Sequence, residues 1–115
     1  MLIAYSVSLD LVRALRPIVS LIEEHDRDEA KQLISSASSI VRNLAEGNRR
    51  RGGDRMRFFS YAEGSASEVR GSVELAIGWG WIADGGEALA IVDRLMGLIW
   101  GLTHRRDKPS DQSRA

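Results

Sequence analysis

The chain has 115 residues, with 16 Lys plus Arg against 16 Asp plus Glu, so its formal net charge is zero and its length favours one domain. Its 43% hydrophobic and 28% charged residues are typical of a folded globular protein and exclude a disordered, collagen-like or membrane-bundle chain. The lack of Cys excludes disulfides, Cys-ligated metals and thiol nucleophiles.

The N-terminus and the longest apolar run indicate neither export nor membrane insertion. The first residues lack a basic segment, and Asp10 and Arg13 interrupt the apolar stretch that follows. The longest uncharged apolar run, residues 75–83, is less than half of the roughly 20 residues that a spanning helix needs. We expect a cytoplasmic protein with no membrane partner.

Apolar residues at three- and four-residue steps predict a first helix at the N-terminus. They form one stripe, made of Ile3, Val7, Leu11, Ala14, Leu15, Ile18 and Ile22. Pro17 lies inside this stretch, but the stripe stays in phase across it. We therefore expect a kink rather than a break.

The clearest helix is predicted over residues 28–49. Its stripe consists of Ala30, Leu33, Ile34, Ala37, Ile40, Val41 and Leu44. Asp26 or Asp28 is expected to cap its first turn, because an Asp side chain accepts a backbone N–H that has no partner within the helix.

A third helix is predicted from Asp54 to about residue 82, after a turn and cap at Gly52-Gly53-Asp54. Its inward stripe is Phe58, Ala62, Ser65, Val69, Ser72, Val73, Ala76 and Ile77. The sequence Asp84-Gly85-Gly86 is expected to end it.

A fourth helix is predicted over residues 87–103, with an inward stripe of Ala88, Ile91, Val92, Leu95, Ile99 and Leu102. Residues 105–115 are polar and are expected to form a disordered tail. No segment alternates with the period of a β-strand. The predicted fold is therefore an all-α, antiparallel up-down-up-down four-helix bundle over residues 1–104.

In such a bundle the charged segments separate to opposite ends. The acidic end collects Glu23, Glu24, Asp26, Asp28, Glu29, Asp84 and Glu87. The arginine end collects Arg49, Arg50, Arg51, Arg55 and Arg57, with Arg105, Arg106 and Lys108 from the tail. Clustered guanidiniums favour phosphate binding, and the alternative is a solvated loop whose charges aid solubility.

Catalytic motifs are nearly absent. The chain has no phosphate-binding loop, no His-Glu-x-x-His and no Gly-x-Ser-x-Gly. His25 lies among carboxylates but has no second His at ligand spacing, so a solvated histidine is expected rather than a metal site. The run of Ser35, Ser36, Ser38 and Ser39 has no neighbouring base. We expect no enzymatic activity, no cofactor and no metal.

Three glycines, Gly64, Gly71 and Gly78, share one face of the third helix, although each costs about 1 kcal/mol against alanine. Close approach of another helix, within the chain or between subunits, would explain them, and tolerance of exposed glycine is the alternative.

Trp79 and Trp81 lie roughly 200° apart on a helix, so both cannot enter one core. A subunit interface is one way to cover them, and the other is a frayed helix end that folds Trp81 back. We expect a homo-oligomer.

Residues 39–47 read Ser-Ile-Val-Arg-Asn-Leu-Ala-Glu-Gly and precede the arginine run. Together with Arg57-Phe58-Phe59, with residues 62–69 and with Gly80-Trp81-Ile82, they closely resemble the four-helix-bundle family encoded in 23S rRNA intervening sequences. The resemblance is strongest over residues 30–83. It implies an antiparallel bundle that assembles into a ring, commonly a pentamer. It also implies kinship with the accessory proteins of diversity-generating retroelements, which bind nucleic acid and partner a reverse transcriptase.

The chain departs from the family pattern at Val41, where Pro is usual, at Gly52-Gly53 in place of Ser and Lys, and at Arg55, where an aromatic is usual. Asn43 and Glu46 match the motif and are expected to build a hydrogen-bonded junction between the second and third helices. Gly47 is expected to end or bend the second helix.

The leading functional prediction is a non-enzymatic oligomer that binds RNA or DNA through the arginine end. The alternative is a protein-interaction scaffold, or a reverse-transcriptase accessory subunit without nucleic-acid binding of its own.

Overall fold

Residues 2–104 are described by the computed structural model of the chain, and they contain four α-helices and no strand. The helices are α1 (Ile3–Glu23), α2 (Arg27–Arg49), α3 (Gly52–Trp79) and α4 (Gly86–Thr103). The all-α prediction is confirmed, whereas the predicted tail at residues 105–115 lies outside the described residues. Over residues 2–104, every helix is too short or too polar to cross a membrane.

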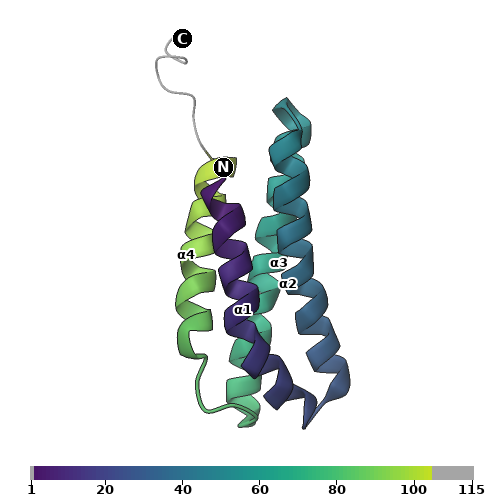
Figure 1. Cartoon of the computed structure of the whole chain (residues 1–115), viewed down its shortest axis with the longest axis vertical. Coiled ribbons are helices and arrows are strands. Elements are labelled where there is room, and N and C mark those ends of the chain that lie inside the picture. The colour runs from purple at the N-terminus through teal and green to yellow at the C-terminus, as the bar shows by residue number, and fades with distance from the viewer. Residues whose placement is uncertain (1, 105–115) are drawn as a thin grey trace.

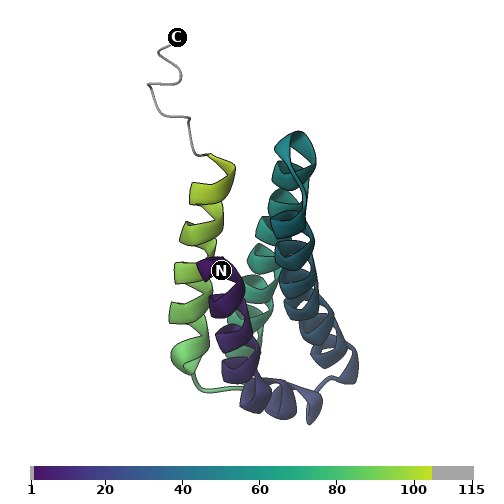
Figure 2. The same cartoon turned by 45° about the horizontal axis from the view of Figure 1, so that its top comes forward.

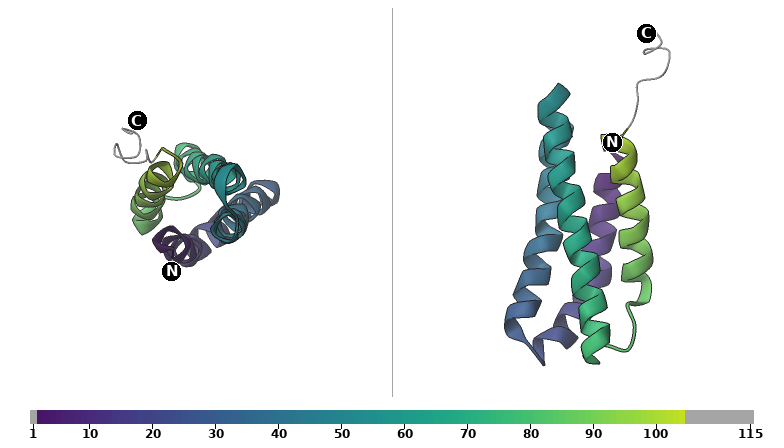
Figure 3. Two further views of the ribbon diagram at one scale, coloured as in Figure 1. Left: turned by 90° about the horizontal axis from the view of Figure 1, so that it is seen from above. Right: turned by 180° about the vertical axis from the view of Figure 1, so that it is seen from behind.

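The helices pack in a cycle in which each contacts its neighbours along the chain and α1 also contacts α4 (Figure 3). In Figure 1 the α1–α2 and α3–α4 connections lie at one end of the molecule, and the α2–α3 connection lies at the other end, with the start of α1. Figures 1 and 2 also show that the α2–α3 hairpin extends beyond the ends of α1 and α4. The tip of this hairpin is therefore accessible from several sides.

The core is built from aliphatic side chains of all four helices and one aromatic ring, that of Phe59. Most predicted stripe residues are buried, as periodicity requires. Two predictions were wrong, because Ile3 and Ile34 are exposed, Ile34 by 50%. In α3 the buried line runs through Phe59, Ala62, Ala66, Val69, Val73 and Ala76, while Phe58, Ser65, Ser72 and Ile77 flank it. The predicted stripe and the buried line of α3 share four positions. Local spacing alone therefore did not determine how α3 is rotated about its own axis.

Helix α1 continues through Pro17, so the expectation that proline does not break the helix is confirmed. Its buried face also contains Ser8, whose hydroxyl donates to the carbonyl of Tyr5 at 2.6 Å. This local hydrogen bond allows a polar side chain to lie in the core.

The helix ends follow the cap predictions in one of three cases. Asp26 caps α2 as predicted, accepting the backbone N–H of Glu29 at 3.0 Å. Asp54 does not cap α3, which begins two residues earlier at Gly52, and its carboxylate contacts arginines instead. Helix α3 also ends before the predicted residue 82, because Gly80 adopts a left-handed φ of 80°. The N–H of Trp81 then donates to the carbonyl of Ala76 at 2.9 Å, which closes the helix end.

A single substitution tests which face of α2 enters the core. Ile40 is fully buried, so Ile40→Asp places a charge in the core without a partner, at a cost of roughly 3–5 kcal/mol. We expect circular dichroism at 25 °C to show an unfolded Ile40→Asp chain. The matched variant Ile34→Asp, in the same helix, is expected to remain helical. If both variants remain helical, or both unfold, the assigned face of α2 is wrong.

Candidate functional site

Of the cations predicted at the arginine end, the structure describes five, which lie together on the α2–α3 hairpin: Arg49, Arg50, Arg51, Arg55 and Arg57. Arg105, Arg106 and Lys108 lie outside the described residues. Two carboxylates, Glu46 and Asp54, share the hairpin tip, so this tip carries a surplus of three positive charges. Charge of this density at an accessible tip attracts anions.

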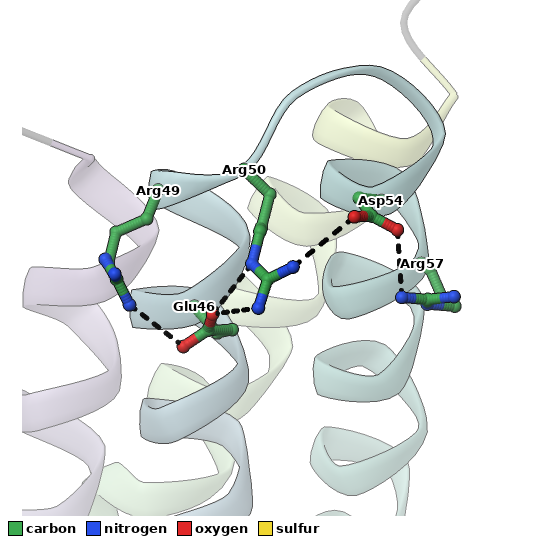
Figure 4. A network of polar contacts seen from close by, with 5 residues as sticks. All are labelled: Glu46, Arg49, Arg50, Asp54 and Arg57. Carbon is green, nitrogen blue, oxygen red and sulfur yellow. Dashed lines mark hydrogen bonds and ion pairs between the residues drawn. The ribbon is translucent and has the colours of Figure 1, made fainter.

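Figure 4 shows a continuous chain of ion pairs across the tip. Glu46 binds Arg50 through Nη2 at 2.7 Å and Nε at 2.8 Å, and it binds Arg49 at 3.3 Å. Arg50 reaches Asp54 on α3 at 3.4 Å, and Asp54 binds Arg57 at 2.9 Å. The hydrogen bond with Glu46 raises the pKa of Arg50 above its ordinary value. Arg50 thus links the last turn of α2 to the first turn of α3.

Two of these guanidiniums lie against the ring of Phe58. The Arg50 and Arg57 guanidinium carbons lie 5.1 and 5.4 Å from its ring centroid, within the range of cation–π attraction. Sequence reasoning placed Phe58 in the core and missed this role. The signal that could have revealed it is the spacing of Asp54, Arg57 and Phe58 along one helix, which brings a carboxylate, a guanidinium and a ring together.

Arg55 is directed into the hairpin. Its guanidinium donates to the carbonyls of Gly47 and Asn48 at 3.3 and 3.4 Å and lies 4.9 Å from the ring centroid of Phe59. It therefore adds a side-chain donor to two carbonyls in the last turn of α2, of which that of Gly47 also accepts the backbone N–H of Arg50.

Arg51 precedes α3 and is exposed, and its side chain makes no ion pair or hydrogen bond with any other residue in 2–104. Its charge is directly available to a ligand. The ion pairs of Arg49 and Arg57 are exposed, and pairs of this kind contribute little to stability. A phosphate can therefore replace a carboxylate at either arginine.

Hydrogen bonds join α2 to α3, but the prediction named the wrong residues, because Asn43 bonds to Ser39 within α2 and Glu46 binds Arg49 and Arg50. Asn43 donates to the carbonyl and the hydroxyl oxygen of Ser39 at 2.9 and 3.0 Å, and the Ser65 hydroxyl donates to that of Ser39 at 2.9 Å. One turn away, the Ser36 hydroxyl donates to Glu68 at 3.0 Å. These contacts fix the register of the two helices and explain two of the four clustered serines.

Gly47 lies inside α2, so the expectation that it ends the helix was wrong. A Cβ at this position would lie 2.7 Å from the Phe59 ring. The glycine is thus required by the close approach of α3. In contrast, a Cβ at Gly64, Gly71 or Gly78 would meet no atom within 4 Å, which excludes close approach of another helix within the described chain.

At the acidic end, three rings lie against one another. The ring centroids of Trp79 and Trp81 are 6.1 Å apart and those of Trp81 and His25 are 5.9 Å apart, with nearly parallel planes. Trp81 lies beyond the end of α3 and folds back onto the core, as one of the two sequence alternatives predicted. Trp79 is 66% exposed.

Among residues 2–104, no three His, Asp or Glu side chains gather in an arrangement suited to a metal ion. His25 contacts an aromatic ring, and His104 stacks on Trp100 with centroids 4.2 Å apart.

Four helices with a core of aliphatic stripes and a basic hairpin define an all-α helical bundle with a charged tip. A family model described as 23S rRNA-intervening sequence protein matches residues 1–99. The chain therefore belongs to this family, as its central motifs indicate, and the match extends to α1 and most of α4. None of the curated proteins and none of the solved structures matches the chain.

The contact between Gly47 and Phe59 can be tested with two glycine substitutions in helices. Gly47→Ala forces Cβ against the ring, and such overpacking costs about 1–3 kcal/mol. Gly71→Ala meets open space and is expected to gain up to about 1 kcal/mol from helix propensity. Urea unfolding should thus give a lower midpoint for Gly47→Ala and a higher midpoint for Gly71→Ala than for the wild type. Equal midpoints for the two variants would contradict the close contact.

Proposed function

We propose that this chain is an RNA-binding homo-oligomer that acts through the arginine end, without enzymatic activity or cofactor. The observation that carries the proposal is the accessible α2–α3 tip, where five arginines face only two carboxylates. Guanidiniums bind phosphate oxygens in pairs of hydrogen bonds and release condensed counterions from nucleic acid. The side chain of Arg51 has no ion-pair partner and can bind a phosphate directly. Arg49 and Arg57 bind a phosphate in place of the carboxylates with which they form weak ion pairs.

We also propose the antiparallel up-down-up-down order for the four helices. The positions of the three connections in Figure 1 support it, as do the contacts of each helix with its chain neighbours. In this order the carboxylates of the α1–α2 and α3–α4 connections are at the end opposite the arginines. The acidic end therefore does not repel a nucleic acid at the tip. A cytoplasmic location is part of the proposal.

Two apolar surfaces support self-assembly. A groove with a cavity of about 220 Å³ lies between α1 and α2, lined in part by Val12, Val19 and Ile34. The second surface is on α4, where Trp100 is exposed; Trp79 is also exposed, but it lies at the end of α3, near the opposite end of the bundle. The cycle of helices puts the α1–α2 side opposite the α3–α4 side. If the α1–α2 surface of one copy contacts the α4 surface of the next, the contact is therefore head-to-tail. Head-to-tail contacts close into a ring when the rotation between successive copies closes, and we propose that they do so here as a pentamer.

The same apolar surfaces favour a second candidate function, a protein-interaction scaffold. In this version the bundle is an accessory subunit of a reverse transcriptase, related to the accessory proteins of diversity-generating retroelements, and it does not bind nucleic acid by itself. Its arginine end would then contact an acidic protein surface.

Filter binding with labelled RNA and DNA at two salt concentrations tests the leading proposal. Wild-type protein should bind with little sequence preference, and its affinity should fall steeply with salt, since each neutralised phosphate releases counterions. Replacement of Arg49, Arg50, Arg51, Arg55 and Arg57 by Ser should abolish binding. Four of these side chains are exposed, but Arg55 packs on Phe59, so circular dichroism must show that the variant remains helical.

A matched variant distinguishes the effect of where the five cations lie from the effect of the total charge of the chain. It replaces five cations elsewhere on the described chain by Ser: Arg13, Arg16, Arg27, Lys31 and Arg94. We expect this variant to retain most of the wild-type affinity. Equal losses in the two five-fold variants would remove the arginine end from the mechanism, and no binding by the wild type at low salt would favour the scaffold.

Light scattering at micromolar concentration tests the assembly. A pentamer has a mass of about 64 kDa, five times the 12.7 kDa of the chain, whereas a mass of 12.7 kDa would refute self-assembly. Trp100→Ser and Ile34→Asp should each reduce the mass while helicity is retained. Leu21→Ser, which removes an exposed leucine outside both apolar surfaces, should leave the mass unchanged.

A further inference from the structure

An exposed aromatic ring lies beside the arginines on α3. Tyr61 is 52% exposed and follows Arg57 by one helical turn, so the two side chains share a face. Its ring meets that of Phe58 edge-on, with centroids 5.8 Å apart and planes at 87°. The guanidiniums of Arg50 and Arg57 in turn lie against the ring of Phe58. The Tyr61 ring is thus supported from one side while half of the residue faces solvent.

Two features leave room and charge around this ring. The hydrogen bond between Ser39 and Ser65 sets the register of α2 and α3, so Arg42, one turn after Ser39, lies level with Tyr61 on the neighbouring helix. The Arg42 side chain is exposed and forms no ion pair or side-chain hydrogen bond with any residue that the structure describes. On the far side of Tyr61, Gly64 has no side chain, and a Cβ there would meet no atom within 4 Å.

We infer that the Tyr61 ring is a stacking surface for one unpaired base of a single-stranded nucleic acid, whose neighbouring phosphates bind Arg42 and Arg57. This inference rests on the proposed function and specifies its ligand. An aromatic ring between cations binds a base through its π face and the backbone through charge, whatever the sequence. A duplex does not fit this arrangement, because its bases are already paired and stacked.

One acidic side chain of α3, that of Glu68, limits the direction of the strand. Glu68 lies on the α2–α3 side of the helix, where it accepts the Ser36 hydroxyl, about two turns from Tyr61 and away from the hairpin tip. A phosphate backbone is repelled there. The strand therefore runs from Tyr61 towards the tip, where Arg49 and Arg51 provide further charge.

The test compares two probes by fluorescence anisotropy: a single-stranded uridine oligomer of about ten nucleotides and an RNA duplex of the same length. Tyr61→Leu should weaken binding of the single strand about ten-fold or more, because stacking is lost. Binding of the duplex, and the salt dependence with either probe, should remain as in the wild type. Tyr61→Phe keeps the ring and should bind both probes as the wild type does.

Met56→Ala is the matched control, because it removes an exposed apolar side chain of the same hairpin that has no π face. It should leave both affinities unchanged. If Tyr61→Leu binds the single strand like the wild type, or weakens both probes equally, the stacking inference is overturned while the proposed function stands. If the wild type binds neither probe, both are overturned.

Discussion

The close approach of α2 and α3 at Gly47 is the constraint on which the arginine end depends. The Phe59 ring occupies the space that a Cβ at Gly47 would need, so the two helices can meet there only with glycine at this position. Arg55 covers the same ring and binds the carbonyls of the last turn of α2. As a result the α2–α3 hairpin stays packed beyond the ends of α1 and α4, where no other helix supports it (Figure 1). The arginines of the tip are thus carried by two helices that pack against each other.

The carboxylates of the tip organise the guanidiniums more than they neutralise them. Glu46 accepts two hydrogen bonds from Arg50, and Arg50 continues to Asp54 on the other helix. Phe58 adds an apolar surface against which Arg50 and Arg57 lie. The result is a cluster with a fixed core of paired arginines and an unpaired Arg51 at its edge. Such an arrangement suits a flexible phosphate backbone, which can approach from several directions, better than a single small anion.

The composition of the site was largely predictable, whereas its internal contacts were not. Five arginines within nine residues of a connection are visible in the sequence, and helix topology alone brings them to one end. The roles within the cluster differ because each depends on residues of the other helix. Arg55 points inward to the carbonyls at the end of α2, and Tyr61 acquires Arg42 as a neighbour only through the register fixed by Ser39 and Ser65. No local pattern encodes that register.

The sequence by itself determined the four helices, the Asp26 cap and most of the core, because a helix stripe and a cap are set by residues within a few positions of one another. It also determined the family, through motifs in α2 and α3. Tertiary structure alone decided that Phe59 rather than Phe58 is buried, that Ile34 is exposed and that Trp81 folds back over the core. Each of these depends on which distant segment fills the space beside the residue, and that space exists only after the helices have packed.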